Sequence, residues 1–191
     1  MLKSIIFFFS LVVLLWAELD PYENFQNYMN SADGRKLSLS VFILDSENNS
    51  KYEGTLYYSG EKHYSFYSEA VGISFGDGII KTINRDTEQI IYDEVVGSNL
   101  SVLDILCGTQ GGLNIDEIIS DRNNYKIEFS AEEWDMTGTL WVKNSGEPIK
   151  VAVGSSEDYQ IVVNITPFDG QSKEKNLFTD TSEYEIIDLR E

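Results

Sequence analysis

Cysteine and histidine are almost missing from this 191-residue chain, which holds one of each, Cys107 and His63. A single cysteine excludes an intramolecular disulfide, so stability has to come from an ordinary core. Neither residue lies in a nucleophile-elbow or metalloprotease spacing, so a Cys/His or Ser/His/Asp site has little support. We interpret His63 as a surface or edge-strand residue and Cys107 as a packing residue at a helix end.

Basic residues are also scarce, with 14 Lys and Arg against 32 Asp and Glu and a net charge of -18. A field of that sign repels nucleic acid and anionic lipid headgroups, so neither is an expected partner. The acidity is interpreted as a soluble, charged surface, with an acidic docking face as the alternative. Neighbouring acids such as Asp93 with Glu94 arise by chance in such a composition. We expect no metal site and no catalytic residues.

Long hydrophobic runs are confined to the N-terminus. Lys3 is followed by the almost wholly apolar run Ile5–Leu15, and Ala17 offers a small residue for cleavage. This pattern predicts a secretory signal peptide over residues 1–17 and a location outside the cytoplasm. The alternative is an uncleaved anchor, although a bilayer span needs about 20 apolar residues. Residues 18–191 are expected to form a single domain.

Helical spacing is found at three places in the rest of the chain. Asp20 and Pro21 read as an N-cap and first turn, and the pattern after them predicts a helix over Tyr22–Ser31. A second helical stretch runs from Ser98 to Leu106 and ends at Gly108. Apolar residues at 115, 118 and 119 predict another short helix after Asn114.

The remaining pattern has a period of two, which indicates antiparallel strands with one buried face. Gly76-Asp77-Gly78 predicts a hairpin between Val71–Phe75 and Ile79–Asn84, and Asn144-Ser145-Gly146 predicts a second one. The other strands are expected over 35–43, 52–59, 63–67, 89–92, 125–129, 136–143, 149–153, 159–165, 176–178 and 184–189. The fold class is therefore mainly β with short helices.

Large side chains share one strand parity across the central strands, namely Tyr52, Leu56, Tyr58, Tyr64 and Phe66. One face of the sheet is therefore expected to be lined with large apolar side chains. Such a face either packs as a closed core or, where few helices cover a curved sheet, encloses an apolar ligand. The pattern alone leaves both possibilities open.

Five short motifs follow one another along the chain, namely Tyr52-Glu-Gly-Thr-Leu-Tyr-Tyr58, Lys62-His-Tyr-Ser-Phe-Tyr67, Phe75-Gly-Asp-Gly-Ile-Ile80, Gln89-Ile-Ile-Tyr-Asp93 and the closing Tyr184-Glu-Ile-Ile-Asp-Leu189. Their order resembles the LolA family of periplasmic lipoprotein carriers. The family's Arg-Pro turn, whose arginine latches a helical lid, aligns with Gly60-Glu61 in this chain. The family's Trp after the Asp-Gly turn is replaced by Lys81-Thr82-Ile83.

The resemblance implies an unclosed antiparallel β-barrel, or half-barrel, with a helical lid and a cavity for the acyl chains of lipoproteins. It implies a monomer in the periplasm that takes its cargo from an inner-membrane ABC transporter and passes it to an outer-membrane acceptor. It also implies no enzymatic activity and no cofactor. Leu103 and Leu106 would belong to the lid, and the expected cavity residues are Leu39, Val41, Leu56, Tyr58, Tyr64, Phe66, Ile73 and Phe75.

Two other functions stay open from the sequence. The first is an envelope module of the same fold that binds a protein partner or another apolar ligand. The second is a secreted hydrolase that uses paired acidic residues.

Overall fold

A computed structural model describes residues 20–45, 49–60, 63–94, 101–108, 113–132, 135–156, 159–168 and 181–190. The predicted signal peptide lies outside these residues, as does the strand expected over 176–178. Among the described residues, no helix is long and apolar enough to cross a bilayer.

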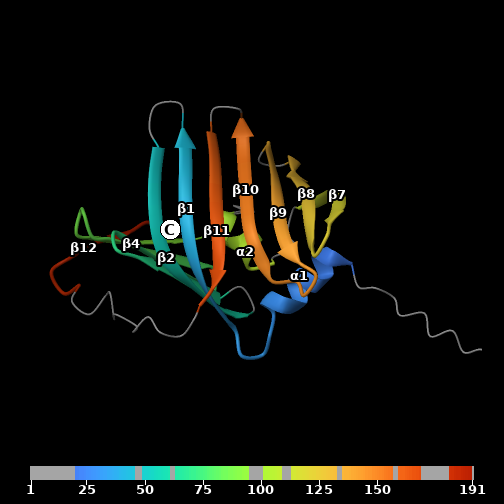
Figure 1. Cartoon of the computed structure of the whole chain (residues 1–191). Helices are drawn as coiled ribbons and strands as arrows, with labels where there is room; N and C mark the ends of the chain where they lie inside the picture. Colours follow the sequence, from blue (N-terminus) through green and yellow to red (C-terminus); the bar gives the residue numbers. More distant parts are fainter. Residues whose placement is uncertain are drawn as a thin grey trace, which may run out of the picture.

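One unclosed sheet of twelve strands forms the body of the protein, in the order β12-β6-β5-β4-β3-β2-β1-β11-β10-β9-β8-β7. All neighbours are antiparallel except β12 and β6. In Figure 1, β1, β2, β9, β10 and β11 stand side by side, and the strands around β4 and β12 run at a steep angle to them. This curvature confirms the expected half-barrel. The strands are β1 (Arg35–Asp45), β2 (Asn49–Gly60), β3 (His63–Ser68), β4 (Val71–Gly76), β5 (Ile79–Asn84), β6 (Gln89–Glu94), β7 (Asn114–Asp121), β8 (Asn124–Ala131), β9 (Met136–Lys143), β10 (Pro148–Ser156), β11 (Tyr159–Pro167) and β12 (Glu185–Asp188).

The register joins apolar residues into rows that cross the sheet on one face. Leu37 of β1 lies opposite Leu56, which lies opposite Phe66 and then Ile73. Because paired residues in a ladder point to the same side, this row defines the concave face. The opposite parity, which includes Tyr57, forms the convex face.

Helix α1 (Pro21–Met29) covers part of the concave face. Its N-terminus is capped by Asp20, whose Oδ1 accepts a hydrogen bond from the Tyr22 amide at 2.8 Å. Phe25 and Met29 are fully buried, four residues apart on one side of the helix. The predicted helix is confirmed, and it ends two residues earlier than expected because Asn30 forms the C-cap.

Helix α2 (Val102–Leu106) lies behind the sheet in Figure 1, against the concave face. Ser101 and Asp104 form a reciprocal capping box that fixes its start. The chain leaves the helix through Gly108 at φ 71°, a left-handed conformation that glycine adopts without strain. The predicted helical segment before Gly108 is confirmed over these residues.

The helix expected after Asn114 is wrong, because these residues form strand β7 and pair with β8. A bulge between Ile115 and Glu117 shifts the register by one residue, so that Ile115 lies opposite Phe129 and Ile118 opposite Ile127. Two apolar residues three positions apart therefore reach the same face of a strand. This bulge produces the spacing that resembled a helix.

Both predicted hairpins are confirmed. In the first turn Asp77 and Gly78 have φ values of 54° and 78°, as a two-residue type I′ turn requires. The closing strand is also confirmed, but it runs parallel to β6, with Ile186 opposite Ile90. It extends the sheet at the far end from β7.

Gly146 in the β9–β10 turn fixes the position of α1. Its φ is 82°, and a Cβ atom added there would lie 2.2 Å from the backbone oxygen of Asn24 in α1. Gly78 has a similar φ of 78°, but nothing lies within 4 Å of its added Cβ. A side chain at Gly78 would therefore introduce backbone strain alone, whereas a side chain at Gly146 would introduce both backbone strain and a steric clash with α1.

We expect Gly146→Ala to lower the free energy of unfolding by more than Gly78→Ala does. Both changes introduce left-handed strain of about 1–2 kcal/mol, and only the first also displaces α1. Urea denaturation of the two variants measures the difference. Equal losses would contradict the contact between this turn and α1.

Candidate functional site

The eight predicted cavity residues all lie on the concave face, because the register pairs them with one another or with residues of the same parity. Five of them are buried in the main core, namely Leu39, Leu56, Tyr58, Tyr64 and Phe66. The other three, Val41, Ile73 and Phe75, are partly buried and pack against that core. Leu103 and Leu106 of α2 are buried in the same cluster. Acyl binding by these residues stays a prediction.

Burial of the concave face differs between its two halves. On β8 to β11 the inward side chains Ile127, Leu140, Val151 and Val163 are 0% exposed. They share one cluster with α1 and α2, so this half is a filled core.

The half formed by β4, β5 and β6 is less covered. Ile73 of β4 pairs with Thr82 of β5, which pairs with Ile91 of β6. Phe75 pairs with Ile80. All five side chains are partly exposed. Ile83, on the convex parity, is instead buried. At this end of the sheet the apolar concave surface is therefore available for contact.

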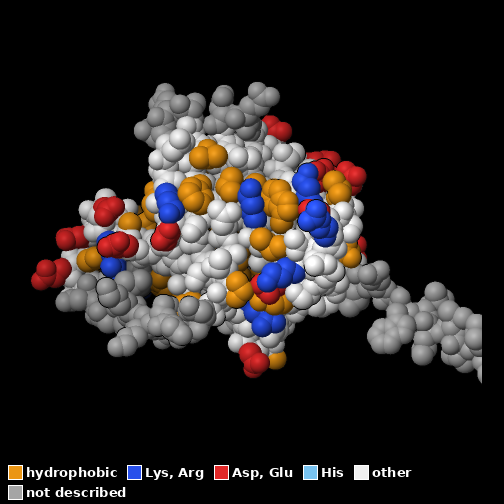
Figure 2. All heavy atoms as spheres, in the orientation of Figure 1, with side chains coloured by type: hydrophobic (Ala, Val, Ile, Leu, Met, Phe, Trp, Pro, Cys, Tyr) orange, Lys and Arg blue, Asp and Glu red, His pale blue; other side chains and the backbone are white. Residues whose placement is uncertain are grey.

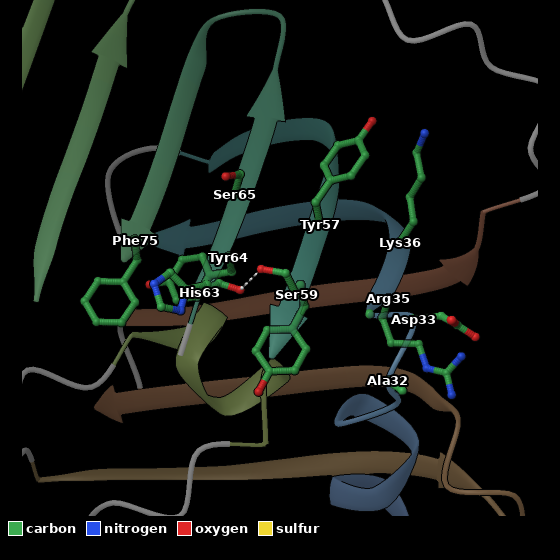
Figure 3. Close-up of a pocket in the computed structure, with 12 residues that line it drawn as sticks. Ala32, Asp33, Arg35, Lys36, Tyr57, Ser59, His63, Tyr64, Ser65 and Phe75 are labelled. Atoms are coloured by element: carbon green, nitrogen blue, oxygen red, sulfur yellow. Dashed lines mark hydrogen bonds between the residues drawn. The ribbon is translucent and has the colours of Figure 1, made fainter. Parts of the chain in front are cut away.

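A hollow of about 710 Å³ opens beside this surface, at the ends of β1 to β4. Its apolar lining includes Tyr58, Tyr64 and Phe75, and the rings of Tyr64 and Phe75 lie 5.4 Å apart. Figure 3 shows Phe75 and His63 together at one end, and Arg35 and Lys36 at the other. Aromatic rings at one end and the charged side chains of Asp33, Arg35 and Lys36 at the other suit an amphipathic molecule.

His63 is the first residue of β3, which is an inner strand, and its side chain is 44% exposed, so the prediction of a surface residue holds and that of an edge strand does not. Its Nε2 lies 3.5 Å from Oδ1 of Asp77. Ser59 lies nearby, but its hydroxyl donates to the backbone oxygen of His63 at 3.3 Å. The serine proton is thus directed at the main chain. Asp93 and Glu94 are consecutive in β6, so their carboxylates point to opposite faces and do not form the pair that a glycosidase needs.

Two tyrosines of the concave face connect the sheet to the helices. The Tyr58 hydroxyl donates to Oδ1 of Asn30, the C-cap of α1, at 2.7 Å. The Tyr64 hydroxyl lies 3.5 Å from Oγ of Ser101, the N-cap of α2. Burial raises the pKa of Tyr64, so its hydroxyl keeps its proton. These two contacts connect both helices to the sheet.

The two helices are also joined to each other and to β1. Gln26 of α1 donates through Nε2 to the backbone oxygen of Gly108 at 3.2 Å. Arg35 donates through Nε to the backbone oxygen of Tyr28 at 2.5 Å, and its guanidinium carbon lies 4.1 Å from the centre of the Tyr28 ring. The helices therefore form one connected cover over the filled half.

Cys107 is the C-cap of α2 and is 1% exposed. Burial raises the pKa of its thiol well above the ordinary value, and the nearby Asp104 acts in the same direction. The thiol is therefore protonated and shielded, which agrees with its interpretation as a packing residue. Within the described ranges, no group of three His, Cys, Asp or Glu side chains could hold a metal ion.

Comparison with known proteins shows similarity of fold. No family profile matches the sequence, and no curated protein matches it. An uncharacterised conserved protein from Thermus thermophilus is similar in structure, with a TM-score of 0.50, 6% identity and coverage of 88% of this chain and 99% of that one.

Two other solved structures are a LolA superfamily protein from Nitrosomonas europaea and lipoprotein LppX from Mycobacterium tuberculosis. The first has a TM-score of 0.45 and 8% identity, covering 76% of this chain and 90% of that one. The second has a TM-score of 0.40 and 10% identity, covering 78% and 92%. At these identities the likeness extends to the fold alone.

The tyrosine contacts predict a measurable effect on α1. Tyr58→Phe removes the bond to Asn30, so we expect the free energy of unfolding to fall by about 1 kcal/mol. Because α1 holds Gly108 through Gln26, labelling of the Cys107 thiol in the folded protein should become faster. Tyr57→Phe, which removes a hydroxyl from the opposite face of the same strand, is the control. Identical labelling rates in the two variants would contradict the role of Tyr58.

Proposed function

We propose that this protein binds acyl chains on the concave face of its half-barrel and carries lipoproteins or lipids through the cell envelope. The observation that carries this proposal is the partly exposed apolar surface of β4 to β6, which includes Ile73, Phe75 and Ile91 and adjoins the hollow. Each methylene removed from water contributes about 0.8 kcal/mol, so long chains leave a bilayer only for a sheltered apolar site.

The hollow suggests how such a ligand is oriented. Its acyl chain would extend over the concave face past Phe75, and its polar end would stay near Arg35 and Lys36 at the other end. The basic groups attract an anionic or carbonyl-bearing headgroup, and the headgroup keeps its contact with water at the margin. An amphipathic ligand therefore fits the hollow, with its acyl chain on the apolar side chains and its headgroup at the basic margin.

The predicted signal peptide and the family resemblance support a location in the periplasm, where the carrier would act as a monomer. An inner-membrane ABC transporter would load it, and an outer-membrane acceptor would receive the cargo. The protein would act as a chaperone of lipoprotein transport, without enzymatic activity or a cofactor.

A second candidate function is a binding module of the same fold that recognises a protein partner. The observation that favours it is the filled half of the concave face, where Ile127, Leu140, Val151 and Val163 leave no exposed surface. Native mass spectrometry of the mature protein from its own envelope distinguishes the two. Co-purified acylated molecules support the carrier, and a stoichiometric protein complex without lipid supports the module.

Phe75→Glu is expected to weaken binding of a fluorescent acyl probe by at least about tenfold, because a charged group in the apolar site has to be desolvated when the chain binds. Ser74→Glu is the matched control, since Ser74 is the adjacent residue and points to the convex face. Circular dichroism and urea denaturation verify that both variants fold. If a folded Phe75→Glu protein binds the probe as the wild type does, the concave face is not the acyl site.

A further inference from the structure

The convex face of the six strands from β8 to β2 carries a charge opposite to that of the chain. By register, it presents two glutamates, Glu53 and Glu128, which form ion pairs with Lys51 and Lys126, and Lys143 is paired with Glu147 in the adjoining turn. Five of the chain's 14 basic residues also point to this side, namely Lys36, Lys51, Lys126, Lys143 and Lys150. No described helix covers these strands on this side, since α2 lies behind them (Figure 1). A protein of net charge -18 therefore has one locally basic surface.

Aromatic side chains lie between these lysines. Trp141 of β9 is flanked by its direct ladder partners Lys126 and Lys150. The Nζ of Lys150 lies 4.7 Å from the centre of a Trp141 ring, which is within cation–π range. Lys126 forms an ion pair with Glu128, next to it on the same face. The Lys150 ammonium thus contacts the tryptophan ring, while the Lys126 ammonium is held by Glu128.

The same combination recurs on β1 and β2. Lys51 Nζ lies 5.6 Å from the centre of the Phe42 ring, and Phe42 is paired with the apolar Val162. Lys36 Nζ lies 3.7 Å from the Phe168 ring and 4.7 Å from the Tyr57 ring. Figure 2 shows basic and hydrophobic side chains alternating across this surface, with acidic side chains gathered mainly toward its margins.

We propose that this lysine–aromatic face, defined by Lys36, Phe42, Lys51, Lys126, Trp141 and Lys150, docks on the anionic surface of a lipid bilayer. Ammonium groups meet the phosphates of the headgroups. Tryptophan and the aliphatic stems of lysine suit the boundary just beneath, where polar and apolar layers adjoin. An acidic protein would satisfy the lysines but would leave the aromatic rings without an apolar layer to enter.

The net charge argues against membrane binding only when it is averaged over the whole molecule. At physiological ionic strength the Debye length is about 8 Å, so acids on other faces are screened from a bilayer that touches the convex face. At about 0.01 M salt the Debye length is about 30 Å, and the whole negative charge opposes approach. Binding should therefore be strongest at intermediate salt.

This inference goes beyond acyl binding and does not depend on it. Lys36 also lines the hollow, and the other residues of the lysine–aromatic face lie on the opposite side of the sheet from Ile73, Phe75 and Ile91. The test is co-sedimentation of the mature protein with vesicles of equal parts phosphatidylglycerol and phosphatidylcholine. We expect binding at about 0.15 M salt, weaker binding at about 0.01 M and at about 1 M, and little binding to pure phosphatidylcholine.

Lys150→Glu should weaken vesicle binding by about tenfold or more. Lys81→Glu is the matched control, since Lys81 also lies over an aromatic ring, Tyr92 at 5.6 Å, but on β5. Binding of a soluble acyl probe should be the same in both variants, which separates this test from that of the carrier function.

Three results would overturn the proposal. One is the absence of wild-type binding to anionic vesicles at every salt concentration, and another is an equal loss in Lys150→Glu and Lys81→Glu. The third is capture of an acidic polypeptide such as polyglutamate by the wild type while vesicles stay unbound, which would assign the face to a protein partner.

Discussion

The concave face of the sheet is larger than the described helices can cover, and the rest of the structure depends on this mismatch. Helix α1 has nine residues and α2 has five, which corresponds to lengths of about 14 Å and 8 Å at 1.5 Å per residue. They face a single sheet of twelve strands. Where the helices lie, side chains such as Ile127 and Leu140 are fully buried. Over β4 to β6, the same parity carries Ile73 and Ile91 with part of their surface exposed.

This unequal cover gives the inner tyrosines two roles. Tyr58 and Tyr64 pack in the apolar cluster through their rings, and through their hydroxyls they reach the caps of the two helices. A phenol can do both because its apolar body and polar tip are separated by the length of the ring. The helices are thus positioned by side chains that also form the wall of the hollow, so a molecule bound in the hollow would contact the same residues that position the helices.

The distribution of charge follows from the two faces of the sheet. A strand sends alternate side chains to opposite faces, so lysines at positions of convex parity gather on one surface whatever the composition of the chain. Lys126, Trp141 and Lys150 belong to three different strands and become neighbours only through the ladder register. Composition alone describes this protein as uniformly acidic, whereas its surface is divided into basic and acidic regions.

The sequence by itself determined the parity of the central strands, the two hairpins, the Asp20 cap of α1, the end of α2 at Gly108 and the common face of the eight predicted cavity residues. These features are local, because a period of two and a capping side chain act within a few residues. The bulge at Ile115, the parallel pairing of β12 with β6 and the division of the eight residues into buried and partly exposed groups were decided by tertiary structure. Each of these depends on which distant strand or helix lies alongside, and burial is a property of that packing rather than of the residue.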